Sequence, residues 1–192
     1  MRKIILGSTS PYRRELLERL KIAFTTASPD IDESALPNEK PKALVIRLAE
    51  AKAREIAKSE NNALIISGDQ IAVCDETILG KSGNRDTAIK QLQMVSGKSI
   101  VFESALCLFD SATHEFQIDI VPFTVHFKTL TQAQIENYLD KEPAFNCAGS
   151  FKSEGLGICL TEKFEGDDPT ALIGLPLIRL TQMLANVGVD IV

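Results

Sequence analysis

The first sixty residues alternate between short apolar runs and segments with helical periodicity. Residues 3–8 and 24–27 are short apolar runs, and each predicts a strand. Proline opens two longer segments, 11–20 and 41–59, in which apolar residues recur every three or four positions. This spacing places them on one face of a helix, and proline is favoured in the first turn of a helix. The polar segment 28–40 between the two predicts a loop.

A continuous apolar run, Leu64–Ile66, predicts a strand that is buried on both faces. The polar residues that follow it, Ser67–Gln70, predict the end of that strand. Residues 71–74 and 77–79 predict a hairpin. We therefore expect Asp69 at the edge of a sheet, where α/β proteins commonly bind ligands.

The second half of the chain is richer in strand patterns. Residues 99–109 and 116–127 predict a pair of strands, and the apolar run 158–160 predicts another after a glycine-bearing loop. Three further segments have helical patterns: 86–95, 131–140 and 176–187. Together these elements predict a single α/β domain over residues 1–192, with an elongated mixed β-sheet and flanking helices.

The charge balance disfavours several classes of partner. The chain holds 26 acidic and 21 basic residues, which gives a formal net charge of −5. Proteins that bind nucleic acids or anionic membranes usually carry a basic patch, so we expect neither partner. No apolar run approaches the roughly 20 residues of a membrane span, and the first residues lack the long apolar segment of a signal peptide. We expect a cytoplasmic protein.

The cysteines and histidines show no spacing typical of a zinc site. Four cysteines lie mostly in apolar runs and form no C-x-x-C pair: Cys74, Cys107, Cys147 and Cys159. We expect buried, reduced thiols. The two histidines, His114 and His126, are not spaced as metal ligands relative to each other or to a cysteine. Zinc chemistry is therefore disfavoured.

The segment Ser8–Arg14 lies between a predicted strand and a predicted helix. Its hydroxyls, the amides of a helix N-terminus and the guanidinium of Arg13 suit a phosphate group. Ser10 also suits an ordinary helix N-cap, and both interpretations stay open. A second segment, Ser96–Ser99, looks like the end of a P-loop. That motif requires glycine where this chain has Leu92, so we reject it.

Carboxylates in two places suit catalysis or metal binding. Asp30, Asp32 and Glu33 lie in the polar loop, where they suit Mg²⁺ or Mn²⁺ bound together with phosphates, or simply face solvent. Asp69 follows the apolar strand, where a carboxylate is costly unless it is paired, hydrogen-bonded or bound to a metal. An active-site base or metal ligand fits that position, and a turn cap is the alternative.

Two lysines differ from the surface background. Lys81 ends a predicted hairpin strand, and Lys52 lies in a helix among small residues: Ala49, Ala51 and Ala53. Small neighbours allow another group to approach closely. Each lysine is also compatible with an ordinary side chain whose stem packs along the surface.

Taken together, these segments resemble the motifs of the Maf family. Residues Leu6–Leu17 resemble the family's opening motif. Six further matches follow in the family's order over nearly the whole chain: Asp32–Glu33, Leu48–Ala53, Gly68–Gln70, Leu79–Lys81, Gly149–Gly155 and Gly174–Pro176. Several spaced motifs in one order are more specific than any single motif.

The resemblance implies a two-lobed α/β fold around a central cleft, with the general architecture of inosine triphosphatases. It also implies hydrolysis of a nucleoside triphosphate between the α- and β-phosphates by a homodimer that uses a divalent cation such as Mg²⁺, Mn²⁺ or Co²⁺. We expect five residues to hold the triphosphate: Ser8, Ser10, Arg13, Lys52 and Lys81. We expect Glu33 and Asp69 to share the cation, and Asp69 to accept the proton of the attacking water.

Three positions sort substrates within the family. Members that act on dTTP and UTP have arginine after the Ser-Pro, threonine after the aspartate, and a loop like Ala-Tyr-Gly-Ile-Gln-Gly. This chain has Tyr12, Gln70 and, within residues 150–155, Glu154. It is therefore similar to the branch that acts on 7-methylguanosine triphosphate, although that branch commonly has tryptophan at position 12. A cationic base stacks well on an aromatic ring, and a carboxylate both accepts from guanine and offsets the charge.

Two alternatives remain at this point. One is dTTP or UTP hydrolysis within the same family. The other is a nucleotide-binding regulator without catalysis, for example a partner of the cell-division or cell-envelope machinery. A pure binder need not keep a base and a metal site, so four residues disfavour the regulator: Glu33, Lys52, Asp69 and Lys81.

Overall fold

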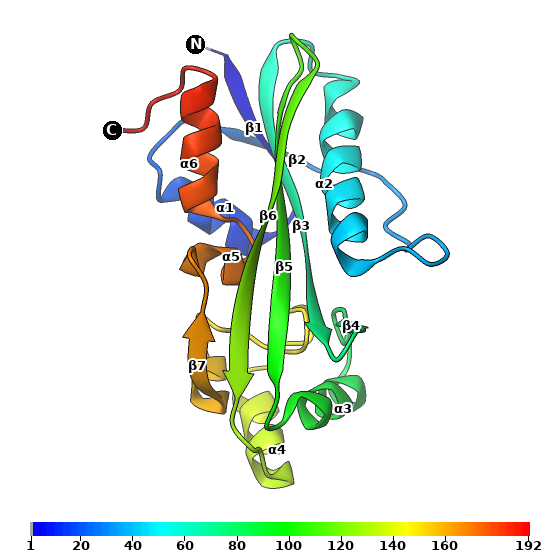
Figure 1. The fold of residues 1–192 in the computed structure, drawn as a ribbon. Coiled ribbons are helices and arrows are strands. Elements are labelled where there is room, and N and C mark those ends of the chain that lie inside the picture. Colours follow the sequence, from blue (N-terminus) through cyan, green and yellow to red (C-terminus); the bar gives the residue numbers. More distant parts are fainter. Residues whose placement is uncertain (1) are drawn as a thin grey trace. The chain divides into compact units, whose positions relative to one another are not determined.

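Strands of very different lengths join one mixed sheet within residues 2–192, the part of the chain that the computed structural model describes (Figure 1). They are β1 (Lys3–Gly7), β2 (Thr25–Ala27), β3 (Ala63–Cys74), β4 (Thr77–Leu79), β5 (Ser99–Asp110), β6 (Glu115–Phe127) and β7 (Thr161–Glu165). The sheet order is β2-β1-β3-β5-β6-β7, and β4 pairs with β3. β1 is parallel to β2 and β3, whereas β3–β4 and β6–β7 are antiparallel. The predicted mixed α/β sheet is confirmed.

Helices lie in several of the connections between these strands and after the last strand. They are α1 (Pro11–Glu18), α2 (Pro41–Ala57), α3 (Arg85–Val95), α4 (Gln132–Lys141), α5 (Pro169–Ile173) and α6 (Leu177–Asn186), with the 3₁₀ helix η1 (Leu156–Leu160). Capping explains several starts. Thr131, for example, forms a reciprocal capping box with Gln134 at the start of α4. In the described part of the chain, no helix is long and apolar enough to cross a membrane.

The chain divides into two compact units. Unit 1 comprises the residues up to Asp69, Ser104–Val121 and Asp168–Val192. Unit 2 comprises Gln70–Glu103 and Pro122–Asp167. The strands β3, β5 and β6 contribute residues to both. The central cleft that the family resemblance implies stays a prediction.

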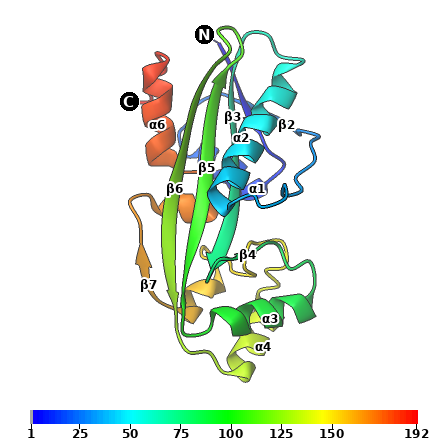
Figure 2. The same ribbon diagram turned by 45° about the vertical axis from the view of Figure 1, so that its right-hand side comes forward.

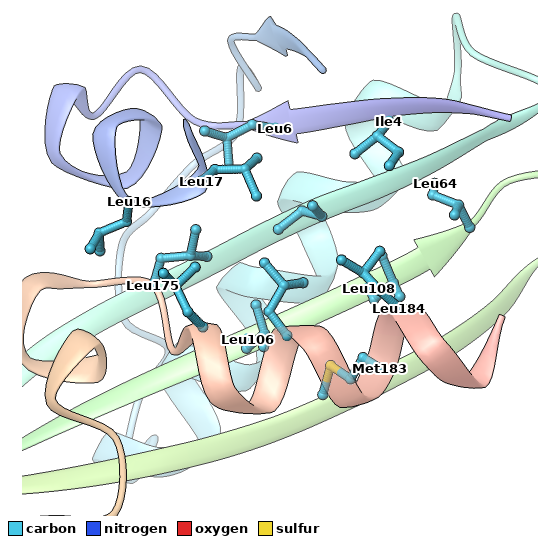
Figure 3. Close-up of a cluster of buried hydrophobic side chains, with 13 residues drawn as sticks. Ile4, Leu6, Leu16, Leu17, Leu64, Leu106, Leu108, Leu175, Met183 and Leu184 are labelled. Carbon is cyan, nitrogen blue, oxygen red and sulfur yellow. The ribbon is translucent and has the colours of Figure 1, made fainter. Parts of the chain in front are cut away.

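The core of unit 1 lies between one face of its strands and the helices α1 and α6 (Figure 3). Alternate residues of three strands supply the sheet side: Ile4 and Leu6, Leu64 and Ile66, Leu106 and Leu108. Leu16 and Leu17 of α1 pack against them, together with Leu180, Met183 and Leu184 of α6. Since strand side chains alternate between faces, the intervening residues Ile5 and Ile65, which are also buried, point to the opposite face.

That opposite face of unit 1 packs against α2. A Cβ atom added to Gly7 of β1 would lie 2.5 Å from Cδ1 of Ile56, so a larger residue there would force the end of that side chain to shift. The periodicity of this helix predicts that Leu44, Val45, Leu48, Ala51 and Ile56 face inward; all of these except the partly buried Ala51 are buried. The run Leu64–Ile66 is therefore buried on both faces, which confirms that prediction.

Unit 2 has its own aromatic core. The ring of Phe151 lies 6.1 Å from that of Phe102 and 5.1 Å from that of Phe127, measured between centroids. All three rings are buried. Helices α3 and α4 lie side by side in both views (Figure 2), and α4 also contacts η1. The segment that follows Gly149 is thus anchored by Phe151 to two strands.

The predicted end of the third strand at Ser67–Gln70 is wrong. β3 continues without interruption from Ala63 to Cys74 and turns directly into β4. Gly68 explains why the polar segment does not break the strand, because a Cβ there would lie 2.5 Å from the carbonyl oxygen of Ala105. Asp69 consequently lies in the middle of a long strand and not at its end.

The strand predicted over residues 158–160 is also wrong, because these residues belong to the 3₁₀ helix η1 and the strand β7 begins at Thr161. The turn leaves Ile158 52% exposed and buries Leu160. It also exposes Cys159, so the expected burial of all four cysteines is wrong there. Cys147 is partly exposed, whereas Cys74 and Cys107 are buried, and none of the four forms a disulfide among the described residues.

Candidate active site

Helix α2 and strand β3 bring a lysine and an aspartate together in unit 1. Lys52 lies on the inward side of α2 and is only 6% exposed. Ser67 and Asp69 share the face of Ile65, because they follow it at intervals of two. Ser67 confirms this direction, since its hydroxyl donates to the carbonyl oxygen of Ala49 in α2 at 2.7 Å. Asp69 is the next residue on that face and meets Lys52.

Lys52 joins two carboxylates. Its Nζ lies 2.7 Å from Oδ1 of Asp69 and 2.7 Å from Oε1 of Glu33. The Asp69 side chain is 13% exposed and that of Glu33 is 60% exposed. A buried ammonium is costly unless it is paired, and here the pairing is double. The structure therefore brings together three of the residues singled out in the sequence.

Glu33 and Asp69 have the donor chemistry that a magnesium-like cation prefers. Both carboxylates reach the same nitrogen, so their oxygens lie within twice the ion-pair distance of each other. Mg²⁺ is commonly bound by one or two carboxylates together with substrate phosphates and water. Among residues 2–192, no three or more histidine, cysteine or acidic side chains are grouped as a metal site. The pair fits a cation that is bound jointly with a nucleotide.

Arg13 lies against the same cluster. Its Nε donates to the Gly174 carbonyl oxygen at 2.8 Å, and its Nη1 donates to the Gly68 carbonyl oxygen at 2.7 Å. Burial lowers the pKa of Arg13, while the charges of Asp69 and Glu33 act in the opposite direction. These two hydrogen bonds use two of the five guanidinium N–H groups. Arg13 thus fixes the backbone beside Asp69 and contributes a second cation to the cluster.

Ser8 and Ser10 take part in the start of α1. The Ser10 hydroxyl oxygen accepts from the Arg13 backbone N–H at 3.4 Å, and the Ser8 oxygen accepts from the Ser10 N–H at 3.1 Å. The capping interpretation of Ser10 is therefore confirmed. Each hydroxyl still carries a hydrogen, which is what a phosphate contact requires. Tyr12 lies half-buried in the first turn of the same helix.

The acidic loop before α2 is held by an arginine that the sequence analysis did not single out. Arg47 donates to both carboxylate oxygens of Glu39, at 2.7 and 2.8 Å, and to the Ser34 carbonyl oxygen at 2.9 Å. The bonds from Arg47 and from a backbone amide lower the pKa of Glu39 to about 2. Asp32 accepts from the Ser34 N–H at 2.9 Å, which is a local turn contact. Arg47 thereby orders the loop next to Glu33.

Lys81, Gln70 and Glu154 belong to unit 2. Lys81 is exposed and forms a backbone bridge with Ala148. The Gly149 N–H donates to the Gly80 carbonyl oxygen at 3.2 Å, which joins the Lys81 segment to the loop that carries Glu154. Glu154 is exposed, and Oε2 of its carboxylate accepts from the Ser153 hydroxyl at 3.3 Å. Gln70 is half-buried in β3.

One glutamine and one glutamate, neither singled out from the sequence, hold the loop that carries Glu154 in unit 2. Gln91 of α3 accepts from the Ser150 hydroxyl at 2.6 Å and donates to the Gly80 carbonyl oxygen at 3.0 Å. Glu142 accepts from Lys152 and from the Leu156 N–H. Neither residue lies in a motif, and each contacts partners that are distant in sequence.

Comparison with known proteins gives consistent matches over the whole chain. The model of the family described as Maf-like protein matches residues 3–187. A 7-methyl-GTP pyrophosphatase of Methylobacillus flagellatus is 54% identical over 192 residues, which is 100% of both chains. Proteins of the same name from Colwellia psychrerythraea and Pseudomonas syringae are 53% and 52% identical over 191 residues, covering 100% of this chain and 96% and 100% of theirs.

Proposed function

Because this chain belongs to the Maf family, we propose that it is a nucleoside triphosphate pyrophosphatase that acts on 7-methyl-GTP. The reaction adds one water and releases the nucleoside monophosphate and pyrophosphate. Two observations support the proposal. The chain is 54% identical over its full length to a relative named for this activity, and unit 1 contains the cluster of Glu33, Lys52 and Asp69. The observation that carries the proposal is the Lys52 ammonium, held 2.7 Å from both Glu33 and Asp69.

Asp69 acts as the general base in this proposal. The carboxylate of Asp69 is fixed by its position in β3 and by its ion pair with Lys52 of α2. In this position it orients the attacking water and accepts a proton from that water. The water oxygen bonds to the α-phosphorus as the bond from that phosphorus to the bridging oxygen breaks, and pyrophosphate leaves with the bridging oxygen. Lys52 and Arg13 offset negative charge on the phosphate oxygens, a contribution that is often the largest in phosphoryl chemistry.

Glu33 and Asp69 would hold a divalent cation together with the phosphates. Bound there, Mg²⁺, Mn²⁺ or Co²⁺ supplies Lewis-acid neutralisation of the phosphate charge. Glu33 is suited to this role because its side chain is largely exposed and its loop is ordered by Arg47. Ser8, Ser10 and Lys81 complete the phosphate contacts in the proposal.

Base choice rests on three residues in the proposal: Tyr12, Gln70 and Glu154. Tyr12 stacks on the positively charged ring of 7-methylguanine by cation–π attraction. Glu154 accepts hydrogen bonds from the guanine edge and offsets the same charge. Its exposure in unit 2 leaves the carboxylate accessible to a ligand. A neutral pyrimidine base lacks this cation and would present carbonyl oxygens to the carboxylate.

The proposal also includes a cytoplasmic location and a homodimer. Among the described residues none of the four cysteines forms a disulfide, which supports a reducing compartment. The homodimer follows from the family resemblance alone, and sedimentation of the purified chain tests it.

A nucleotide panel tests the function. The purified chain is incubated with 7-methyl-GTP, GTP, UTP and dTTP, and pyrophosphate release is measured through a coupled inorganic pyrophosphatase. We expect the highest kcat/KM with 7-methyl-GTP, and the monophosphate as the other product. Higher kcat/KM with UTP or dTTP would favour the other branch of the family. Binding without turnover of any nucleotide would favour a regulator, and a diphosphate product would place the cleavage at another bond.

A further inference from the structure

The turn that carries Glu154 is closed by a carboxylate from a different element. We define the base turn as Lys152–Leu156. Within it, the Gly155 N–H donates to the Lys152 carbonyl oxygen at 3.3 Å. Glu142, directly after α4, accepts from Lys152 Nζ through Oε1 at 2.8 Å and from the Leu156 N–H through Oε2 at 3.0 Å. One carboxylate therefore holds both ends of the base turn, and Glu154 lies between those ends.

Gly155 makes this arrangement possible. A Cβ atom added at Gly155 would lie 2.2 Å from Oε2 of Glu142. Any side chain there would push the carboxylate away from the turn. The glycine therefore admits the carboxylate, which links the backbone of the base turn to α4.

A second group from α4 fixes the start of the base turn. The Lys152 N–H donates to the hydroxyl oxygen of Tyr138 at 3.1 Å, and Tyr138 is buried. The preceding residue, Phe151, is packed in the aromatic core of unit 2. The start of the turn is therefore attached to buried residues, and Glu142 also contacts the far end of the turn.

The same contact controls the charge beside Glu154. The ion pair with Lys152 and the bond from Leu156 N–H lower the pKa of Glu142, so it is ionised at neutral pH. Paired in this way, the Lys152 ammonium is engaged by Glu142. Without Glu142, the Lys152 ammonium loses this carboxylate partner, and its charge, two residues from Glu154 in the sequence, would repel a cationic base.

We propose that Glu142 is a positioning residue for base selection: it holds the base turn and keeps the Lys152 charge away from Glu154. This inference rests on the proposed function, because it concerns the preference for 7-methyl-GTP. Glu142 itself need not touch the nucleotide. Its effect is expected in the KM for the methylated substrate, with kcat preserved, since the phosphate cluster lies on other elements.

The test compares Glu142→Gln with Asp140→Asn. Asp140 lies in α4, two residues before Glu142, and also forms an ion pair, with Arg85 at 2.9 Å, but the pair does not involve the base turn. For Glu142→Gln, we expect the ratio of kcat/KM for 7-methyl-GTP over GTP to fall on the order of 5-fold, the scale of a partly exposed ion pair. We expect Asp140→Asn to keep the wild-type ratio.

A double variant separates positioning from folding. Glu142→Gln/Lys152→Met also removes the Lys152 ammonium. It should therefore recover part of the preference for 7-methyl-GTP over GTP that Glu142→Gln loses. An equal loss of activity on 7-methyl-GTP, GTP and UTP by Glu142→Gln would overturn the proposal and indicate a structural role only. So would an unchanged ratio, or a double variant no better than the single one. If Glu142→Gln does not fold, Lys152→Met alone should still lower the ratio, because it removes one end of the attachment; an unchanged ratio there overturns the proposal.

The outcome is distinguishable from failure of the proposed function. The wild-type chain is assayed first on the same nucleotides. A wild type that hydrolyses them without preference for 7-methyl-GTP contradicts the proposed substrate and this inference together. A wild type with the preference, whose ratio survives Glu142→Gln, contradicts this inference alone.

Discussion

The cluster of unit 1 and the base turn of unit 2 are built in different ways. Lys52 and Asp69 lie within a helix and a strand, and both side chains are largely buried. Glu154 lies in an exposed turn whose position depends on side-chain contacts, chiefly those of Glu142. Groups on regular elements are held more closely than groups on loops. In the proposed mechanism, the reaction chemistry therefore depends on groups held by α2 and β3, whereas base choice depends on contacts within a loop.

Removal of the divalent cation should have the largest effect. Glu33 and Asp69 offer oxygen ligands, and the phosphate charge needs neutralisation for cleavage. We expect turnover of every nucleotide to vanish in excess chelator and to return with Mg²⁺, Mn²⁺ or Co²⁺. The measurement is pyrophosphate release before and after chelation. Full activity after exhaustive chelation contradicts the metal proposal, and with it the view that unit 1 carries the common chemistry.

Asp69→Asn should lower kcat by at least roughly 100-fold on all nucleotides, the usual scale for a lost general base. The change is nearly isosteric and removes the charge and the basicity. Asp167→Asn, at an exposed aspartate in unit 2, is the control and should keep wild-type turnover. Near wild-type turnover of Asp69→Asn, with an unchanged melting temperature, would show that the base is elsewhere.

The two regions also differ in how far they could be predicted from the sequence: the cluster of unit 1 could be, and the contacts of the base turn could not. Glu33, Lys52 and Asp69 were found because they lie in motifs, and the structure brings all three together. Glu142 gave no such signal, because its contacts lie 10 and 14 residues away across a turn. Pairing of this kind depends on how α4 packs, which local periodicity does not encode.

The two wrong predictions of secondary structure have similar physical causes. The polar residues after Leu64–Ile66 predicted the end of a strand, yet β3 continues because Gly68 tolerates the close Ala105 carbonyl and Asp69 is paired by Lys52. The apolar run 158–160 predicted a strand, yet its residues form a 3₁₀ helix with one buried leucine. In both cases tertiary contacts override the local pattern. The long amphipathic helices were predicted well, because their periodicity extends over several turns.

Glu154→Gln should reduce base preference while the phosphate chemistry remains. We expect the wild type to prefer 7-methyl-GTP over GTP by roughly 100-fold in kcat/KM, which corresponds to about 2.7 kcal/mol. Glu154→Gln should lose much of that factor, because an amide accepts a hydrogen bond but does not offset the charge of the base. Asp140→Asn serves again as the control. An unchanged preference in Glu154→Gln would remove Glu154 from base selection.

Tyr12 should have a smaller effect that separates stacking from packing. Tryptophan is the better cation–π partner, so Tyr12→Trp should keep or improve the KM for 7-methyl-GTP, and Tyr12→Ala should raise it most for this nucleotide. The expected changes correspond to about 0.5–2 kcal/mol. If Tyr12 is only the first apolar residue of its helix and packs into the core, Tyr12→Ala should instead lower the melting temperature and affect all nucleotides alike. The measurement is the KM for each nucleotide together with a thermal melt.

The smallest expected effect is the pH dependence of the Glu142 contact. The pKa of Glu142 is lowered in the folded chain, so its ionised form is favoured by folding. Its contribution to stability is therefore fully present above the ordinary glutamate pKa of about 4.3 and is lost as pH falls through the lower folded value. Thermal melts of the wild type and Glu142→Gln should differ at pH 7, and the difference should shrink as the pH is lowered below the ordinary glutamate pKa of about 4.3. Comparing the two proteins at each pH cancels the titration of all other groups. A difference that stays constant, or that grows on acidification, would mean that the carboxylate charge does not hold the base turn.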